Sequence, residues 1–232
     1  MYELPLFPLN TVLFPGMPLH LHIFEERYKL MMQRVMQSNH TFGVNLIKSG
    51  MEAGGPNPEP YPTGCTARVV SVEPAGAGRL NITVVGDERF RVLKMGLSQP
   101  YQVAFVESAP LTSHHSLEVV RGTPSLRGKV TQYLELLSHH SGESEEDAGE
   151  EGGAETEMDL SQIQLPEDPM MLIYLAASLL QIPASEKQPL IEADTLSDLL
   201  KLIQRLYRRE LAVLPELMTV TEDAARFAAW VN

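Results

Sequence analysis

The sequence predicts an α+β fold, in which an antiparallel β-barrel is followed by a bundle of helices. Two observations carry this prediction. Residues 1–108 contain six or seven short apolar or alternating segments, separated by turn residues and accompanied by one helical pattern. After Pro110 the apolar residues recur at helical spacing instead. We therefore expect a barrel subdomain over residues 1–110 and a helical subdomain over residues 111–232.

The opening segment, residues 3–28, has the densest pattern in the chain. It contains four prolines, and because proline lacks a backbone N–H, the strands here should be short, bulged or at a sheet edge. The block Phe14-Pro15-Gly16-Met17-Pro18 predicts a tight turn. Residues 19–23 then alternate strictly, with leucine and isoleucine on one face and His20 and His22 on the other. We expect a strand pair joined by a corner.

The rest of the barrel half follows from the same two periodicities. Apolar residues at helical spacing predict a helix over residues 25–38. The glycine- and proline-rich residues 49–63 predict a loop, and Gly86-Asp87 predicts a turn between two separate strands. The strands are expected at residues 41–48, 65–73, 79–85, 89–95 and 101–107.

The second half contains start signals for several helices. Asp168-Pro169 provides an N-cap followed by proline at the first helical position. Thr195 and Asp198 form a capping-box pattern at the start of a long amphipathic helix. Helices are expected over residues 117–137, interrupted near Pro124, and over residues 170–182, 184–191, 195–211 and 221–231.

The charge of the chain is concentrated in one tract. The formal net charge is -12, and residues 138–162 carry nine acidic residues without any lysine or arginine. This tract has few apolar side chains to bury, so we expect a disordered acidic insertion. The acidic balance also argues against a nucleic-acid surface, since phosphate recognition requires clustered lysine and arginine.

Several protein classes receive no support from the sequence. The single cysteine, Cys65, rules out an internal disulfide, and its strand-like setting favours a structural thiol over a nucleophile. The longest apolar run, residues 170–182, is shorter than the roughly 20 residues that span a bilayer. With no secretory signal at the start, we expect a soluble, cytoplasmic protein.

Six segments of the chain resemble one known family, in the same order along the chain. They are LPLFPLNTVLFPGMPLHLHIFEERY at residues 4–28, FGVNL at 42–46, PTGCTARVVSV at 62–72, VVGDERFRVL at 84–93, PYQVAFVE at 100–107 and EKQPLIEADTLSDLLKLIQRL at 186–206. The chain is similar to the N-terminal, substrate-binding domain of Lon proteases. The resemblance covers nearly the whole chain apart from the acidic insertion. It implies a PUA-like antiparallel β pseudo-barrel followed by a helical bundle.

The same resemblance implies a non-enzymatic module that binds unfolded or damaged polypeptides, with a protease or chaperone as a further partner. Neither a P-loop nor a serine–lysine protease module is recognisable, since the nearest glycine pair, Gly122 and Gly128, has the wrong spacing and Val130 lacks the required hydroxyl. The acidic insertion and Pro189 depart from the family pattern. An RNA- or small-molecule-binding PUA-like regulator is the alternative, and the acidic charge weighs against RNA.

The candidate peptide-binding residues are apolar. Phe14, Pro15 and Met17 form the predicted corner, and a corner has less structural reason than a strand to display phenylalanine and methionine. With Met32 nearby they would form an apolar patch for extended peptides. The hypothesis predicts that serine at positions 14 and 17 weakens client binding with little loss of stability.

The polar candidates have simpler interpretations. Glu25, Arg27 and Arg89 could form a binding cluster, but ion pairs that tie the helix to the strand at residues 89–95 are favoured. His20 and His22 are a weak metal pair without a third ligand, so no metal or cofactor is expected. Homodimerisation through residues 221–232 would cover Trp230, and the sequence leaves this open.

Overall fold

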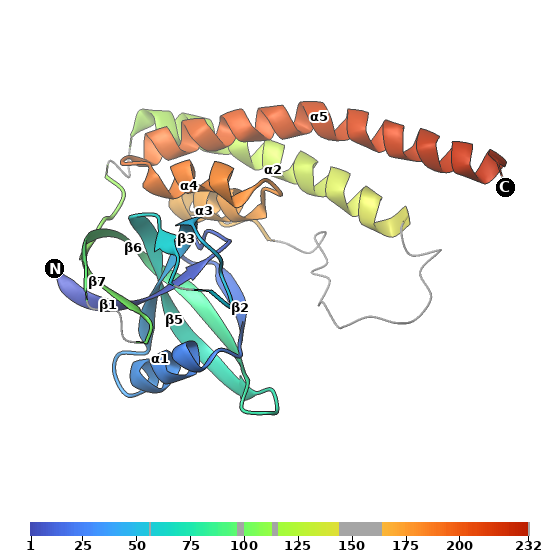
Figure 1. The fold of residues 1–232 in the computed structure, drawn as a ribbon. Coiled ribbons are helices and arrows are strands. Elements are labelled where there is room, and N and C mark those ends of the chain that lie inside the picture. Colours follow the sequence, from blue (N-terminus) through green and yellow to red (C-terminus); the bar gives the residue numbers. More distant parts are fainter. Residues whose placement is uncertain (56, 97–99, 113–115, 144–163, 232) are drawn as a thin grey trace.

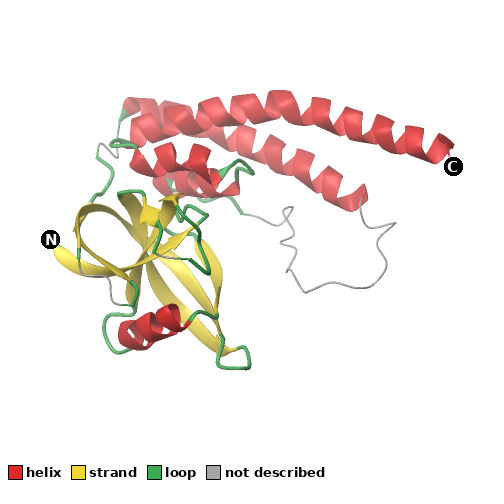
Figure 2. Cartoon of the chain, viewed as in Figure 1, coloured by secondary structure: helices red, strands yellow, loops and turns green. Residues whose placement is uncertain are grey.

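The computed structural model describes residues 1–55, 57–96, 100–112, 116–143 and 164–231, with side chains up to 138 in the fourth range and up to 214 in the last. This part of the chain confirms the α+β class, with seven strands and five helices (Figures 1 and 2). The elements are β1 Tyr2–Leu9, β2 Pro18–Ile23, α1 Glu26–Met36, β3 Thr41–Ser49, β4 Glu59–Pro60, β5 Thr63–Pro74, β6 Leu80–Met95, β7 Gln102–Ser108, α2 Leu117–Glu143, α3 Pro169–Leu179, α4 Ala184–Glu192 and α5 Leu196–Val231.

The strands close into a ring in the order β1-β7-β6-β5-β3, with β3 returning to β1. The β1–β3 pair is parallel and the other pairs of the ring are antiparallel. Strand β1 changes neighbours along its length, because residues 2–6 pair with β7 and residues 6–9 pair with β3. Pro5 and Pro8 therefore each lie where β1 pairs with only one neighbouring strand. The missing N–H of each proline can thus face the unpaired side, and the ring tolerates both residues.

Strand β6 is one continuous strand of 16 residues, whereas the sequence predicted two strands separated by a turn at Gly86-Asp87. The prediction was wrong because the glycine at position 86 does not mark a turn. It allows the corner at residues 14–18 to approach the backbone of β6 closely. The Gly86 N–H donates to the Met17 carbonyl at 2.9 Å, and the Gly86 carbonyl accepts from the Gly16 N–H at 2.8 Å. Glycine provides room there for the corner that precedes β2.

The helical half differs from its prediction at three points. Helix α2 runs through Pro124 without a break, and α5 is a single helix of 36 residues where two were expected. Helix α2 also continues to Glu143, into the segment assigned to the acidic insertion. The remainder of that insertion lies outside the described residues, as does the side chain of Trp230, on which the homodimer expectation rests.

The predicted helix starts at α3 and α5 are confirmed. The Asp168 side chain accepts from the Met171 N–H at 2.8 Å, which caps α3. The Thr195 hydroxyl oxygen accepts from the Asp198 N–H at 3.0 Å and lies 2.7 Å from the Asp198 carboxylate. These two residues form a capping interaction at the start of α5.

One apolar core joins the two halves. The helices α2 to α5 cover one end of the barrel, and α1 lies at the opposite end (Figure 1). A single cluster of buried side chains includes residues of the barrel, α1 and all four later helices. Polar contacts cross the same boundary, since the Gln188 amide donates to the Thr63 carbonyl at 3.1 Å. The boundary predicted near residue 110 therefore separates two kinds of secondary structure that share one core.

Candidate functional site

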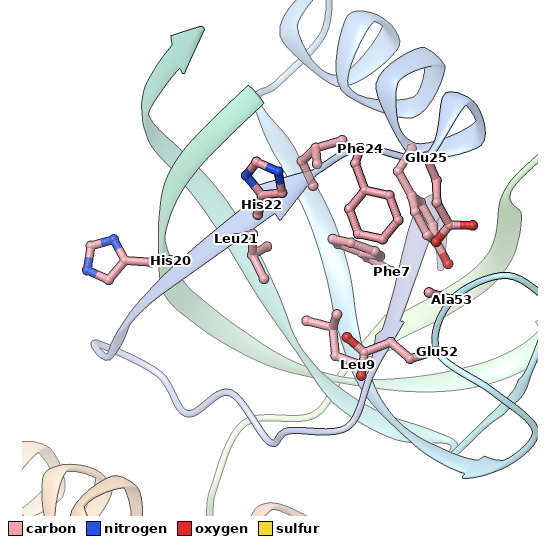
Figure 3. Close-up of a pocket in the computed structure, with 11 residues that line it drawn as sticks. Phe7, Leu9, His20, Leu21, His22, Phe24, Glu25, Glu52 and Ala53 are labelled. Carbon is pink, nitrogen blue, oxygen red and sulfur yellow. The ribbon is translucent and has the colours of Figure 1, made fainter. Parts of the chain in front are cut away.

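A pocket of about 270 Å³ opens on the barrel between β1, β2 and the start of α1 (Figure 3). Strand β1 contributes Phe7 and Leu9, and the loop between β3 and β4 contributes Glu52 and Ala53. The remaining lining residues lie on β2, at its end or on the first turns of α1, and they are His20, Leu21, His22, Ile23, Phe24, Glu25 and Tyr28.

The floor of the pocket is apolar. Alternation along β2 directs Leu21 and Ile23 inward while His20 and His22 face outward. The Phe7 and Tyr28 rings pack with centroids 4.1 Å apart, and both side chains are buried. An apolar group of a ligand would therefore meet aromatic and aliphatic carbon at the bottom of the pocket.

One side of the rim is acidic, and a partly buried arginine holds it in place. The Arg27 guanidinium pairs with the Glu25 carboxylate at 3.0 Å, lies 4.6 Å from the Tyr28 ring centroid and donates to the side chain of Asn57 at 2.9 Å. It also donates to the Glu52 backbone carbonyl at 3.3 Å. Glu25 and Arg27 thus pair with each other, whereas the predicted ion pairs led to the strand at residues 89–95. The hydrogen bonds from Arg27 to Asn57 and Glu52 hold the loop against α1.

The outer rim combines polar side chains with one exposed aromatic ring. His22 and Asn81 share a hydrogen bond of 2.7 Å, and His20 and Thr83 share one of 3.1 Å, so both histidines are tied to β6. Phe24 is 51% exposed and its ring stacks on His22 at 6.1 Å. Among the described residues, no group of three potential ligands is placed to hold a metal ion.

The environment of Tyr28 changes its acidity. The pKa of the Tyr28 phenol is raised to about 12, chiefly by burial and to a smaller extent by the nearby Glu25 and Glu52 carboxylates. Arg27 acts in the opposite direction on this pKa but does not outweigh burial. The Tyr28 phenol is therefore neutral at physiological pH. A raised pKa does not activate this tyrosine as a nucleophile or a base.

The predicted peptide-binding corner is not exposed. Phe14 is 0% exposed, Met17 is 8% exposed and Met32 is 2% exposed, while Pro15 is half-buried. Phe14 packs toward Tyr174 of α3 with ring centroids 6.4 Å apart, and the Ser178 hydroxyl lies 3.2 Å from the Met17 sulfur. The expectation of an exposed patch was wrong because the helical half covers the corner.

Arg89 does not join Glu25 and Arg27. It is buried on β6 opposite Cys65, and it interacts with the Tyr174 hydroxyl of α3, whose pKa burial raises and Arg89 partly lowers. The predicted ion pair from Arg89 to the first helix is therefore wrong. Cys65 is buried, and burial raises the pKa of its thiol, in agreement with a structural role.

Sequence reasoning missed the pocket itself. The alternation of residues 19–23 did place Leu21 and Ile23 on one face, but it did not indicate that Phe7 and Tyr28 complete that face. Phe24 follows directly after the alternating run and could have been recognised as an unassigned aromatic residue. Glu52 lies in the loop that was predicted over residues 49–63, but nothing in that pattern pointed to a site residue.

Comparison with known proteins identifies the family. The sequence model of the ATP-dependent protease La (LON) substrate-binding domain matches residues 3–209. The chain belongs to this family. It is 26% identical over 213 residues to Lon protease 2 of Myxococcus xanthus, a match that covers 91% of this chain and 24% of the relative. The chain therefore spans about a quarter of the length of that relative.

Solved structures share the fold. A Lon N-terminal domain protein from Xanthomonas campestris superposes with a TM-score of 0.60 at 22% identity, over 87% of this chain and 96% of that chain. The N-terminal domain of the Mycobacterium avium complex Lon protease gives 0.56 at 15% identity, over 89% and 98%. None of the helices in the described part of this chain has the length and hydropathy of a membrane-spanning segment.

Proposed function

We propose that this chain is a non-enzymatic module that binds unfolded polypeptide segments at the pocket between β1, β2 and α1. The observation that best supports this proposal is that the Phe24 side chain is half-exposed and lines a pocket with an apolar floor. Such a combination suits apolar side chains that a folded protein would hide and an unfolded one displays. Membership in a substrate-binding family supports the same function.

The size of the pocket favours a side chain over a complete small molecule. Its volume of about 270 Å³ lies below the range of roughly 300–1,000 Å³ that is typical of small-molecule sites. The pocket can accept part of a polypeptide while the remainder stays on the surface. Recognition of single side chains within a longer chain requires little sequence specificity, as a binder of damaged proteins needs. Delivery of the captured chains to a protease in the cytoplasm is part of the same proposal.

The proposal can be tested with a permanently unfolded client. We suggest reduced, carboxymethylated α-lactalbumin with a fluorescent label, titrated with the protein and followed by fluorescence anisotropy. Phe24→Ser is expected to weaken binding about fivefold to tenfold, since a well-packed aromatic contact contributes on the order of 1–1.5 kcal/mol. The thermal midpoint should stay unchanged, because this side chain is half-exposed.

Leu30→Ser provides a matched control. Leu30 is 48% exposed on α1, close to the exposure of Phe24, but it does not line the pocket. This variant should bind the client as the wild type does. Equal losses in the two variants would point to general surface hydrophobicity and would contradict a specific site. Tight, salt-sensitive binding of a labelled RNA oligonucleotide would instead favour the alternative regulator.

A further inference from the structure

Strand β2 has one unpaired edge, and it faces an unpaired edge of β1. In the described chain β2 pairs with β6 alone, through residues 18–23. Strand β1 pairs with β7 only as far as Leu6, so residues 7–9 pair with β3 on one side and with no strand on the other. We call the gap in pairing between residues 7–9 of β1 and residues 18–23 of β2 the seam.

The two edges of the seam run antiparallel. Strands β1 and β3 are parallel, and each step from β3 to β5, β6 and β2 reverses direction, so β2 runs opposite to β1. The two strands are nevertheless not hydrogen-bonded to each other. Unpaired strand edges present backbone N–H and C=O groups that can pair with another chain. The seam is therefore a place where the barrel can accept an additional strand.

The pocket lies at the seam. Phe7 and Leu9 line it from β1, and Leu21 lines it from β2 (Figure 3). Ile23 of β2 lines it as well. A chain that lies along the free edge of β2 would place alternate side chains toward this apolar floor. The backbone edge and the pocket thus form one continuous recognition surface.

We propose that a bound polypeptide adds to the free edge of β2 as an extended strand and places an apolar side chain in the pocket. This inference rests on the proposed function, and it specifies how the chain binds. Backbone pairing provides affinity that does not depend on sequence, while the pocket selects the side chain. A binder of many unfolded chains benefits from this division, since every polypeptide carries the same backbone groups.

The charge of the rim defines the occupant further. The contacts of Glu25 and Glu52 use only the Oε2 atom of each carboxylate, toward the Arg27 guanidinium and the Asn10 N–H. The Oε1 atoms make no hydrogen bond within the described residues. Arg27 is already engaged by Glu25, Asn57 and the Glu52 carbonyl. The rim therefore favours a lysine or arginine two residues from the apolar one, about 7 Å along the same face of the added strand.

The test of strand addition uses synthetic peptides with the full chain. The parent is an end-blocked octapeptide with leucine and lysine alternating at its odd positions and serine at its even positions. One derivative carries N-methyl groups on its odd-numbered backbone amides, and a second derivative carries them on its even-numbered amides. In an extended strand, successive N–H groups point to opposite sides, so only one set can face β2. We expect one derivative to bind at least tenfold more weakly and the other to stay within about threefold of the parent.

The two proposals fail in different ways. If both derivatives bind as the parent does while Phe24→Ser still weakens the parent, strand addition is overturned and the pocket function stands. Equal losses in both derivatives also overturn pairing to a single edge. If neither the parent peptide nor the unfolded client binds, the proposed function itself fails.

Two variants of the protein test the proposed preference for a basic side chain. Glu52→Gln keeps an oxygen that can accept from the Asn10 N–H but removes the negative charge. It should reduce affinity for the lysine peptide about threefold to tenfold and leave the affinity for a norleucine analogue unchanged. Glu26→Gln is the control, because Glu26 is exposed, pairs with Lys29 and lies outside the pocket. An equal loss in both variants would show a general effect of charge and overturn the assignment of the basic side chain.

Discussion

Gly86 lies so close to Phe14 that a methyl group on it would come within 2.2 Å of the Phe14 carbonyl oxygen. The same glycine exchanges two backbone hydrogen bonds with the corner, one with Gly16 and one with Met17. The corner, strand β6 and helix α3 therefore meet at one point, where the barrel joins the helical half. The position tolerates only a residue without a side chain.

We predict that Gly86→Ala lowers the free energy of unfolding by about 1–3 kcal/mol or more, because the added methyl group must displace backbone atoms. Urea unfolding followed by circular dichroism measures the change. Gly128→Ala is the matched control. Gly128 lies in α2 with open space around its Cβ position, so alanine should raise the free energy by about 0.5–1 kcal/mol. Similar stability of Gly86→Ala and wild type would contradict the close approach.

A second prediction separates two phenylalanines that flank β2, Phe14 in the corner before it and Phe24 directly after it. Phe14→Ala should lower the free energy of unfolding by about 3–5 kcal/mol, since it empties a fully buried site. Phe24→Ala should change it by no more than about 0.5 kcal/mol but weaken binding of an unfolded client. Parallel urea unfolding and anisotropy titrations measure both quantities. The reverse pattern would restore the corner as the binding surface.

A third prediction concerns the start of α5. Thr195→Ala removes the hydroxyl oxygen that accepts from the Asp198 N–H at 3.0 Å. The free energy of unfolding should fall by about 1 kcal/mol, and thermal or urea unfolding would detect this. Thr131→Ala, on the exposed surface of α2, serves as the control and should stay within about 0.5 kcal/mol of the wild type. A loss of equal size in both variants would show that the capping hydrogen bond contributes nothing.

A fourth prediction concerns alkaline pH. The pKa of Tyr28 is raised from 10.0 to about 12, so between these values the unfolded chain has lost the phenolic proton and the folded protein retains it. Stability should fall as pH rises through this interval. In Tyr28→Phe the slope of the free energy of unfolding against pH should be smaller than in the wild type, by the equivalent of about one proton. Below pH 9 the two proteins should show the same pH dependence. Urea unfolding at several pH values tests this, and identical alkaline slopes would contradict it.

The sequence predicted the class of fold and most of the elements because alternation and helical spacing are local properties. The long β6 could not be recognised, since the meaning of Gly86 depends on the corner that packs against it from 70 residues earlier. The continuity of α2 through Pro124 could not be recognised either, and the contacts next to this proline are not visible in residue spacing. The Thr123 hydroxyl donates to the Val119 carbonyl at 2.6 Å, and the Gln204 side chain of α5 donates to the Gly122 carbonyl at 3.0 Å.

The candidate site was harder to predict than the fold. Phe14 and Met17 look exposed in a turn, and only the packing of α3 over that turn hides them. The Glu25–Arg27 pair depends on Glu25 lying just before the helix, and Arg89 was assigned to the wrong neighbours. A pocket built from β1, β2, α1 and a distant loop depends on the closure of the barrel, which residue spacing does not encode.

The apolar core that joins the two halves has a consequence for how a bound client would stabilise the protein. Because barrel and helices share that core, they are expected to unfold together, and any ligand that binds only the folded barrel also stabilises the helices. At a ligand concentration of 100 times Kd the gain is about 2.7 kcal/mol. Amide hydrogen exchange should therefore slow in α3, outside the seam, when a peptide occupies the seam. Binding at the barrel would in this way reduce the local opening of the helices.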